Sequence, residues 1–376
     1  MPEPFKNFFN EDVILGMATH FKKQWQEFDD KAFVKTALNN LEALELKARS
    51  EQITNSMIQY LPEDFEQAGK IMLACLGREL GDKITDESID RSGISGWGVM
   101  PMTHYVGLQG QDHIDLSMTL LKEMTKRFSS EFGIRFFLLE STEQTLSILK
   151  TWARDSNHHV RRLASEGSRP RLPWAMRLPM FINDPTPVID LLALLKDDDK
   201  EYVRRSVANS LNDIAKDHPD VVAELAEQWM KGANIDRKRL IRHGCRSLIK
   251  NGHKKALEVL GYGLPRLAQA EIKILTPEVE FGSDLQFTLT IVSDSNQDQS
   301  LMIDYLIHHQ KANGRTSPKV FKWKDITLGA EKTLTSTKKH GFKKITTRVD
   351  YPGTHRVEVM VNGVSVGDAE FQLLML

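Results

Sequence analysis

The chain contains few cysteines, and they form no recognisable pattern. Its 376 residues include two cysteines, Cys75 and Cys245, which lie far apart in the sequence. This excludes a disulfide framework and a zinc site built on closely spaced thiolates, and it is typical of a reducing compartment such as the cytosol. His158 and His159 are adjacent, but no further ligand follows at a suitable spacing. We therefore expect neither a metal nor a cofactor.

Long apolar runs and glycine-rich phosphate loops are also missing. No stretch approaches the roughly 18 apolar residues that a membrane-spanning helix requires. The opening residues, MPEPFKNFF, lack the features of a signal peptide. Neither a Walker loop nor a dinucleotide-binding fingerprint is found. The sequence therefore predicts a cytoplasmic protein and excludes the nucleotide sites that are built on such loops.

The net charge of −1 conceals an uneven distribution of charge. Residues 1–150 carry 16 basic and 23 acidic side chains, a balance of −7, whereas residues 151–270 carry 21 and 15, a balance of +6. Residues 311–349 carry 11 basic and 2 acidic side chains, a balance of +9. Local basic surfaces decide whether a protein attracts a polyanion, so the total charge does not exclude one. The lysines of the last segment are either a polyanion-binding surface or a solubility feature.

Helical periodicity dominates residues 1–260. Phe9, Val13, Met17 and Phe21 recur at a spacing of four, which predicts one buried face of an amphipathic helix. After about residue 268 the periodicity changes to two. Alternating apolar residues at 285–292 and 355–361 predict half-buried strands, with a looser strand at 301–307 and a hairpin turn at Asn362-Gly363 before 364–366.

A degenerate repeat runs through the middle of the chain. Val160-Arg161-Arg162-Leu163-Ala164 is echoed by Val203-Arg204-Arg205-Ser206-Val207 and, more weakly, by Ile241-Arg242-His243-Gly244-Cys245, at offsets of 43 and 38 residues. Each copy follows an acidic or Asn-containing stretch that predicts a helix N-cap, at 155–157, 197–199 and 234–236. Periods near 40 residues are typical of HEAT-like solenoids, whose equivalent helices line one face. The arginine pairs would then form a ladder of cations.

These patterns predict a mostly α protein with a β domain. We expect a helical-repeat α-solenoid over residues 1–266, followed by a small immunoglobulin-like β-sandwich over residues 270–376.

The most informative stretch is residues 157–177, where five arginines surround one acid, Glu166. The arginines are Arg161, Arg162, Arg169, Arg171 and Arg177. A carboxylate among guanidinium groups stays ionised, and guanidinium forks suit phosphate oxygens. The stretch therefore combines a phosphate grip with a fixed negative charge, which suits an enzyme that holds a polyanion and stabilises a developing cation.

Each of these features also has a plain structural interpretation. The arginine pairs also fit solvated helix faces, and Glu166 fits a salt-bridge partner for Arg162 or Arg169. Glu131, before the apolar run 134–138, passes for a surface acid. Asp213 fits a local cap or ion pair, and Trp174 fits a core anchor.

Several sequence motifs in the helical part of the chain are distinctive. The longest is His159-Val160-Arg161-Arg162-Leu163-Ala164-Ser165-Glu166-Gly167-Ser168-Arg169-Pro170-Arg171-Leu172-Pro173-Trp174-Ala175. Shorter motifs lie at Glu3–Asn7, Ala43–Ser50, Glu131–Arg135, Tyr202–Asn209 and Asp213–Asp220. Together they closely resemble bacterial DNA alkylation repair glycosylases of the AlkC type. The resemblance spans residues 1 to about 260, and the sandwich resembles the subgroup with an immunoglobulin-like C-terminal domain.

The resemblance implies a HEAT-like array wrapped on duplex DNA and hydrolysis of the N-glycosidic bond of small cationic alkylated bases, chiefly 3-methyladenine. It also implies that the DNA is kinked and the base is not flipped into a pocket. By matching residue type, the family's functional positions fall on Glu131, Phe132, Glu166, Arg169, Trp174 and Asp213.

Chemical reasoning agrees with these positions. An N3-alkylated purine already carries a positive charge and leaves without strong acid catalysis, so a carboxylate is needed to stabilise an oxocarbenium-like sugar and to orient water. Glu166 is the first candidate, Glu131 the second and Asp213 the third. Phe132 and Trp174 would contact the lesion or fill the space at the opened base step. The expected DNA-contacting set is Arg162, Arg169, Arg171, Arg204, Arg205 and Asn209, and the basic β-domain would offset the free energy of kinking.

The expected partner is duplex DNA with alkylated bases, bound by a monomer in the bacterial cytoplasm and associated with the nucleoid. Two other functions stay open from the residues alone. A non-enzymatic helical-repeat scaffold would bind DNA without releasing bases and would tolerate replacement of Glu166. A protein-binding solenoid would show little salt-dependent affinity for DNA.

Overall fold

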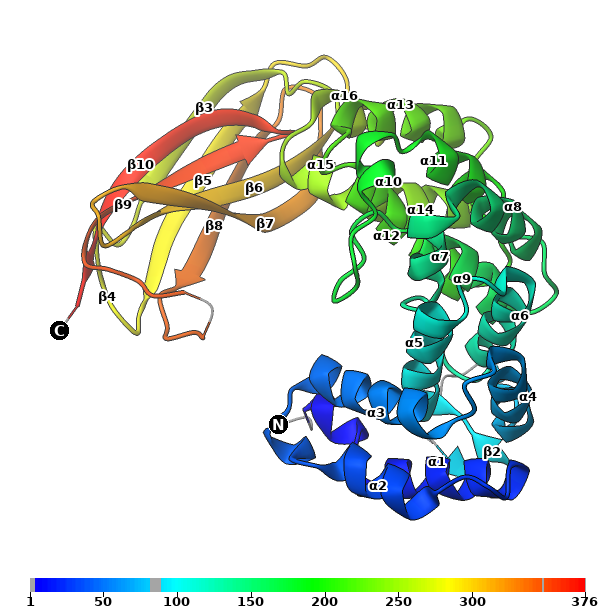
Figure 1. Cartoon of the computed structure of the whole chain (residues 1–376). Coiled ribbons are helices and arrows are strands. Elements are labelled where there is room, and N and C mark those ends of the chain that lie inside the picture. The colour runs from blue at the N-terminus through cyan, green and yellow to red at the C-terminus, as the bar shows by residue number, and fades with distance from the viewer. Residues whose placement is uncertain (1–3, 82–88, 347, 376) are drawn as a thin grey trace. The chain divides into compact units, whose positions relative to one another are not determined.

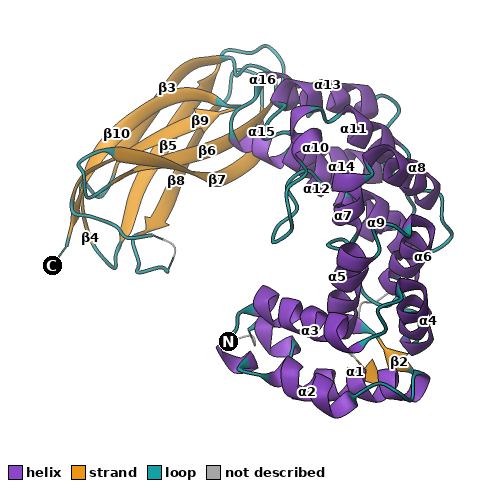
Figure 2. Ribbon diagram, in the orientation of Figure 1, coloured by secondary structure: helices purple, strands orange, loops and turns teal. Residues whose placement is uncertain are grey.

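A computed structural model describes residues 4–81, 89–346 and 348–375 (Figure 1). Glu3, the first residue of one AlkC-like motif, lies outside these ranges. The chain divides into two compact units, Met1–Asp217 and His218–Leu376. The first is almost entirely helical, and the second combines helices with two β-sheets (Figure 2). The predicted succession of helical repeats and a β domain is therefore confirmed.

The first unit is a succession of short amphipathic helices. Phe9, Val13, Met17 and Phe21, predicted to share one face, are all buried. The helices are α1 (Glu11–Gln24), α2 (Asp30–Leu38), α3 (Leu46–Tyr60), α4 (Phe65–Cys75), α5 (Val99–Gln109), α6 (Ile114–Thr125), α7 (Ile134–Glu140), α8 (Thr142–Trp152), α9 (His158–Gly167), α10 (Pro179–Asn183), α11 (Thr186–Ala193) and α12 (Glu201–Ile214). Short 3-10 turns lie at η1 (Phe5–Phe8), η2 (Leu41–Ala43) and η3 (Gly96–Gly98), and a two-stranded ribbon at β1 (Ile89–Asp90) and β2 (Gly93–Ile94).

Helices α9 and α12 carry the first two copies of the repeat and pack against each other. The predicted N-cap of α9 is confirmed, because the Asn157 side chain accepts a hydrogen bond from the His159 amide. Helices α6, α8 and α11 also pack on α9. Two connections next to α9 carry candidate residues: residues 126–133 between α6 and α7, and residues 168–178 between α9 and α10. Packing around α9 therefore places the site.

The first arginine of each of the first two copies, Arg161 and Arg204, holds the turn that precedes α12. Arg161 binds both carboxylate oxygens of Asp198, at 2.6 and 2.9 Å, and Asp199 at 2.7 Å. Arg204 donates to the backbone oxygens of Asp198 and Asp199, at 2.6 and 3.0 Å. These two guanidinium groups thus serve the acidic turn at residues 197–199, where the repeat had predicted rungs of a cation ladder.

The second unit begins with α13 (Pro219–Met230), α14 (Ile235–Gly244), α15 (Arg246–Lys250) and α16 (Lys254–Val259). Its strands form a five-stranded sheet in the order β4-β10-β9-β6-β7 and a three-stranded sheet in the order β3-β5-β8. They are β3 (Leu267–Ile274), β4 (Glu278–Glu280), β5 (Asp284–Ser293), β6 (Gln299–Gln310), β7 (Thr316–Leu328), β8 (Thr333–Gly341), β9 (Gly353–Val361) and β10 (Val364–Leu374). Alternating residues of β5, β6 and β9 form the apolar core between the sheets.

The predicted hairpin turn is confirmed. Asn362 and Gly363 have φ angles of 48° and 76°, and Val361 pairs with Val364 in the antiparallel ladder. Positive φ at both central residues is the geometry that favours Asn-Gly in two-residue hairpins. The change from helix to strand falls at Leu267, inside the predicted division at 266–270, whereas packing assigns α13–α16 to the same compact unit as the sandwich. Among the described residues, no helix has the length and apolar character needed to cross a membrane.

Candidate active site

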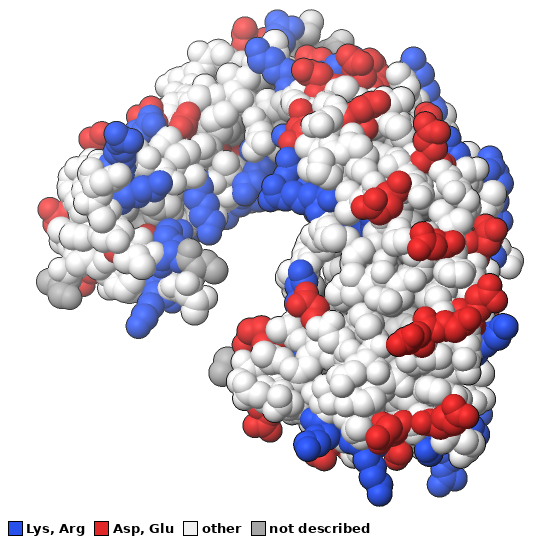
Figure 3. Space-filling model, in the orientation of Figure 1, with Lys and Arg blue, Asp and Glu red and all other residues white. Residues whose placement is uncertain are grey.

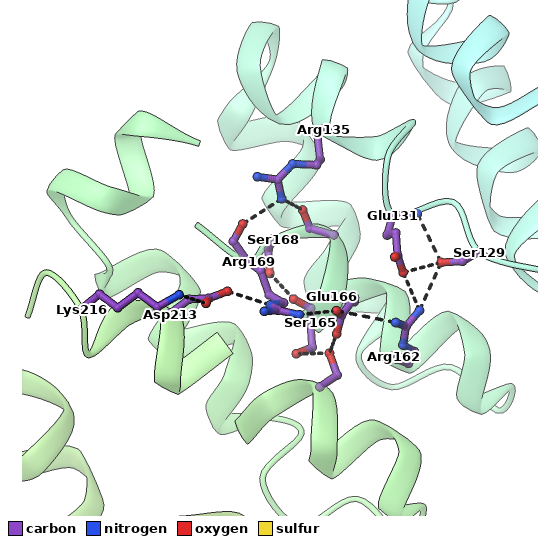
Figure 4. Close-up of polar contacts among 12 residues, drawn as sticks. Ser129, Glu131, Arg135, Arg162, Ser165, Glu166, Ser168, Arg169, Asp213 and Lys216 are labelled. Carbon is purple, nitrogen blue, oxygen red and sulfur yellow. Dashed lines mark hydrogen bonds and ion pairs between the residues drawn. The ribbon is translucent and has the colours of Figure 1, made fainter. Parts of the chain in front are cut away.

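Three acids that are far apart in sequence meet in one chain of alternating charges (Figure 4). Its order is Glu131, Arg162, Glu166, Arg169, Asp213, Lys216. Successive nitrogen–oxygen distances are 2.7, 3.6, 2.5, 2.8 and 2.9 Å. The acids come from the α6–α7 connection, α9 and α12, so the packing of α9 against its neighbours assembles the chain.

Glu166 lies at the centre of this chain, in the last turn of α9, and is 5% exposed. Its Oε1 accepts from Arg169 at 2.5 Å, and its Oε2 accepts from the Ser206 hydroxyl at 2.6 Å. Burial alone would raise the pKa of this carboxyl, but the charges of Arg162 and Arg169, with the hydrogen bonds from Ser206 and Arg169, hold its pKa below the usual value. Glu166 is therefore a buried carboxylate that is ionised at neutral pH.

Glu131 is more accessible than Glu166, with 17% of its side chain exposed. Its Oε2 accepts from the Ser129 hydroxyl and from Arg162, both at 2.7 Å. The nearby Gly133 packs tightly on α5, where an added Cβ would lie 2.4 Å from the Thr103 carbonyl oxygen. A glycine is thus required for this connection to bring Glu131 to Arg162.

Asp213 lies between Arg169 and Lys216 in the chain of alternating charges. Its Oδ2 accepts from Arg169 Nε at 2.8 Å, and its Oδ1 accepts from Lys216 at 2.9 Å. The side chain is 3% exposed and lies outside the lining of the cavity described below. Asp213 therefore orients Arg169, which in turn holds Glu166.

A fully buried arginine holds the connection that follows α9. Arg135, on α7, is 0% exposed and donates to the backbone oxygens of Gly167 and Arg169, each at 2.8 Å, and of Met176 at 2.7 Å. Burial and the charge of Arg169 lower the pKa of Arg135 to about 10, so it remains protonated at neutral pH. This clamp fixes both ends of the segment that carries Trp174.

The chain of charges opens onto a cavity of about 330 Å³ in the first unit. Glu131, Phe132, Arg162, Glu166, Arg169 and Trp174, all predicted from the sequence, contribute to its lining. Trp174 is 59% exposed, which rules out the alternative that it is a core anchor. It has a φ of 65°, in the left-handed region that non-glycine residues rarely adopt and that often marks functional sites. The site thus pairs the buried Glu166 and the partly buried Glu131 with an exposed indole.

Aromatic rings from the N-terminal segment pack against two tryptophans of the cavity lining, Trp97 and Trp174. Phe8 stacks on Trp97 with centroids 5.0 Å apart, and the exposed Phe5 meets Trp174 edge to face at 6.2 Å. The guanidinium of Arg162 lies over the Tyr202 ring, with its Cζ atom 5.0 Å from the ring centroid. Planar rings and a cation-holding carboxylate pair are the features that a cationic heterocycle prefers.

The remaining predicted DNA contacts lie outside this cavity lining. Arg171 forms a two-pronged ion pair with Asp217, at 2.7 Å for both contacts. Arg205 is exposed on α12 and contacts Glu201 at 2.7 Å, and Asn209 is half-buried one turn later. Arg162 and Arg169, predicted to hold phosphates, here hold carboxylates instead. Phosphate contact by these residues stays a prediction, and the geometry favours Arg162 and Arg169 as the groups that fix the acids.

Sequence reasoning missed three residues that build the site: Arg135, Tyr202 and Ser206. Ser206 and Tyr202 lie within the Tyr202–Asn209 motif, but neither their types nor their spacing shows that they reach Arg162 and Glu166. Arg135 interrupts the apolar run 134–138, and a charge inside such a run is the one local signal that a buried clamp was present. No group of three or more His, Cys, Asp or Glu side chains in the described ranges is arranged to hold a metal.

The second unit carries a basic groove of about 510 Å³ between α14–α15 and β6–β7. Figure 3 shows basic side chains gathered where α15 meets these strands. Its lining includes the cations Arg239, Arg242, Arg246, Lys250 and Lys322 and one acid, Asp304. Arg242 and Lys322 both contact Asp325, at 3.2 and 2.5 Å. The groove therefore has a surplus of positive charge within a single compact unit.

Comparison with known proteins identifies the class of this domain pair. A family model described as a DNA alkylation repair enzyme matches residues 128–247, which contain all three acids. A second, described as the C-terminal Ig-like domain of the uncharacterised protein YhaZ, matches residues 268–375. A helical DNA alkylation repair domain followed by an immunoglobulin-like sandwich is thus the class to which the fold and site point.

Whole-chain comparisons define the family more closely. YhaZ of Bacillus subtilis (strain 168) is 35% identical over 370 residues, covering 98% of this chain and 99% of YhaZ. The Pseudomonas fluorescens alkylpurine DNA glycosylase AlkC, solved bound to DNA containing an abasic site analog, has a TM-score of 0.85 and 35% identity, covering 99% of this chain and 100% of AlkC. The chain belongs to the AlkC family of alkylpurine DNA glycosylases.

Proposed function

We propose that this protein is a DNA glycosylase that hydrolyses the N-glycosidic bond of small cationic alkylated bases, chiefly 3-methyladenine, in duplex DNA. The observation that carries the proposal is the chain of alternating charges through Glu131, Glu166 and Asp213, which opens on a cavity with an exposed Trp174. Membership of the AlkC family and the match to a DNA-bound relative support it.

Glu166 stabilises the sugar cation. Because 3-methyladenine is a cation in DNA, breaking its bond to the sugar leaves a neutral base and an oxocarbenium-like sugar, and the base needs no strong acid. A carboxylate held rigidly by Arg162, Arg169 and Ser206 meets this new charge without reorganising. Such preorganised groups typically contribute about 2.7–4 kcal/mol to lowering a barrier.

Glu131 orients the attacking water. Both of its side-chain hydrogen bonds with the described residues use Oε2, which anchors the carboxylate, and in this proposal Oε1 binds the water. The water loses its proton to a carboxylate as it attacks the anomeric carbon, and a partly exposed acid can return that proton to solvent. Asp213, which is outside the lining, acts only through Arg169.

Trp174 and Phe132 contact the lesion within a kinked duplex. The exposed indole attracts a cationic base by about 0.5–2 kcal/mol. Because the indole is exposed at the protein surface, a base can contact it without being flipped out of the duplex. Enzymes that enclose the base in a deep pocket do require flipping. Arg205, on the exposed face of α12, contacts DNA phosphates in this scheme.

The basic groove of the second unit binds the phosphate backbone. Kinking a site of 20–30 base pairs requires on the order of 1–6 kcal/mol by elastic estimates, and added phosphate contacts offset this energy. In this role the sandwich supports the bend and does not take part in the chemistry. The protein then works as a monomer among bacterial DNA in the cytoplasm.

Base release from methylated duplex DNA tests this proposal. The freed bases are separated by chromatography, and abasic sites in the DNA are counted in parallel. Free 3-methyladenine above the spontaneous background, with a matching number of abasic sites, is the expected result. Tight, salt-dependent binding without base release would establish the non-enzymatic scaffold instead.

A further inference from the structure

A second cavity adjoins the catalytic one in the first unit. It has a volume of about 310 Å³ and shares four lining residues with the catalytic cavity: Lys47, Met100, Phe132 and Trp174. The two aromatic side chains assigned to the lesion are therefore a common wall. None of the three acids of the charge chain lines this second cavity.

Flat and polarisable side chains form most of the second cavity. Phe132, Phe136, Trp174 and His104 contribute rings, and the His104 and Phe136 centroids lie 5.3 Å apart. Met100 and Met176 contribute thioethers, which make favourable contacts with aromatic rings. Such a lining selects a planar heterocycle over an aliphatic or strongly charged ligand.

A few polar groups complete the lining. One of them, the Ser50 hydroxyl, has no hydrogen-bond partner among the described residues. Ser50, on α3, is 2% exposed, and its hydroxyl makes no hydrogen bond within the described ranges. A helical serine can bond to the carbonyl four residues earlier, but this one does not. A buried hydroxyl without a partner is unfavourable and is uncommon in native proteins, so it points to a ligand that supplies the bond.

The groups around Ser50 suit the edge of a nitrogen heterocycle. Glu51 and Lys47 are exposed at the rim, where a carboxylate accepts from an exocyclic amine. Burial lowers the pKa of His104, and the charge of Lys47 lowers it further, while Glu51 opposes this. A neutral imidazole offers one donor and one acceptor. The size also fits, since an engineered cavity of about 150 Å³ holds benzene.

We propose that this second cavity binds a free purine base, the product that leaves the catalytic cavity past Phe132 and Trp174. The purine ring lies among the aromatic side chains. The Ser50 hydroxyl oxygen is covered by protein atoms, so on binding this side chain turns into the cavity and donates to a ring nitrogen the hydrogen bond that it otherwise lacks. The identity of the occupant as the reaction product rests on the proposed glycosylase function. Binding of the base itself does not, because it needs no DNA.

Calorimetric titration of the full-length protein with free 3-methyladenine, without DNA, tests the proposal. Saturable binding is expected, and Ser50→Ala should weaken it about tenfold, the effect of one neutral hydrogen bond. This variant removes a hydroxyl that bonds to none of the described residues, so folding should be unharmed. Leu108→Trp fills the cavity from its rim, where Leu108 is 42% exposed, and should abolish binding. Leu15→Trp, at a similarly exposed leucine on α1, is the matched control and should bind normally.

The outcomes separate the two proposals. Two results would overturn the cavity proposal and leave the glycosylase function in place. In the first, the protein excises bases but binds no free base. In the second, the Ser50→Ala and Leu108→Trp variants bind the free base as tightly as the wild-type protein does. Free-base binding that these variants weaken, in a protein that forms no abasic sites, overturns the glycosylase function and the product assignment together.

Discussion

Replacing Ser206 by alanine should shift the pH dependence of excision. The Ser206 hydroxyl lies 2.6 Å from Glu166 Oε2 and 2.9 Å from the Ser165 hydroxyl, and both serines are buried. A carboxylate can only accept, so the single Ser206 proton goes to Glu166 and the Ser165 hydroxyl donates to Ser206. Ser206→Ala removes a bond that favours the ionised form of Glu166.

The magnitude follows from the strength of that bond. Hydrogen bonds to charged groups contribute about 1.5–3 kcal/mol and neutral ones about 0.5–1.5 kcal/mol, so the Ser206 bond favours the ionised form of Glu166 by the difference, on the order of 1 kcal/mol. The pKa of Glu166 should rise when this preference is lost. Because the ionised carboxylate is the active form, the variant should lose activity on acidification at a higher pH than the wild-type protein.

Single-turnover excision of 3-methyladenine across pH measures this shift as the acidic limb of the rate profile. Ser206→Thr keeps a hydroxyl and should restore the wild-type limb. Ser210→Ala is the matched control: Ser210 lies one turn later on α12, is 0% exposed and has a hydroxyl that bonds to none of the described residues, so its limb should not move. An unmoved limb in Ser206→Ala, or equal behaviour of the Thr and Ala variants, would refute the reasoning.

Three further predictions concern the clamp, the groove and the sandwich. Arg135→Lys should leave at least one buried backbone carbonyl without a hydrogen bond. Each such carbonyl should lower the free energy of unfolding, measured in urea, by about 1–3 kcal/mol, and the variant should excise bases more slowly. Alanine at Lys322 and Arg246 should reduce the slope of log affinity against log salt by about 1 for each phosphate that the variant no longer binds. Burial, with the charge of Arg348, lowers the pKa of His309 to about 3 and of His340 to about 4, from 6.5. The unfolded chain binds these protons first, so thermal unfolding should occur at lower temperature as pH falls from 6.5 towards 4.

Each of these three results has a clear opposite. An Arg135→Lys protein with unchanged stability and rate would remove the clamp from the account. Lys31→Ala, at an exposed lysine on α2, is the control for the groove, and an equal change in slope would show that net charge alone decides binding. A melting temperature that does not change between pH 7 and pH 4 would show that the buried histidines do not govern the sandwich.

Local patterns were enough to predict the elements of the fold. Spacing of apolar residues identified the buried face of α1 and the strands β5 and β9. Asn157 and the Asn362-Gly363 turn were recognised because capping and hairpin chemistry depend on residues within a few positions of each other. These features do not depend on distant parts of the chain.

The contacts between the charged residues of the site could not be predicted in the same way. The sequence shows Glu166 as the only acid among five nearby arginines, but Glu131 and Asp213 arrive from 35 residues before and 47 residues after it. Because Glu131 and Asp213 lie next to them, Arg162 and Arg169, which were expected to bind phosphates, form ion pairs with carboxylates. Ser206 reaches Glu166 across 40 residues, and a serine on a helix carries no local sign of such a contact.

The most direct test of the central claim, that Glu166 is the catalytic charge, compares excision and binding in Glu166→Gln. Arg162 keeps Glu131 and Arg169 keeps Asp213 in this variant, and unchanged affinity for DNA with an abasic site serves as the check on folding. Glu143→Gln, an exposed acid on α8, is the matched control. We expect affinity within about threefold of wild type and single-turnover excision reduced by about 10²–10³. Excision at a near wild-type rate by a folded, DNA-binding Glu166→Gln protein would contradict the account.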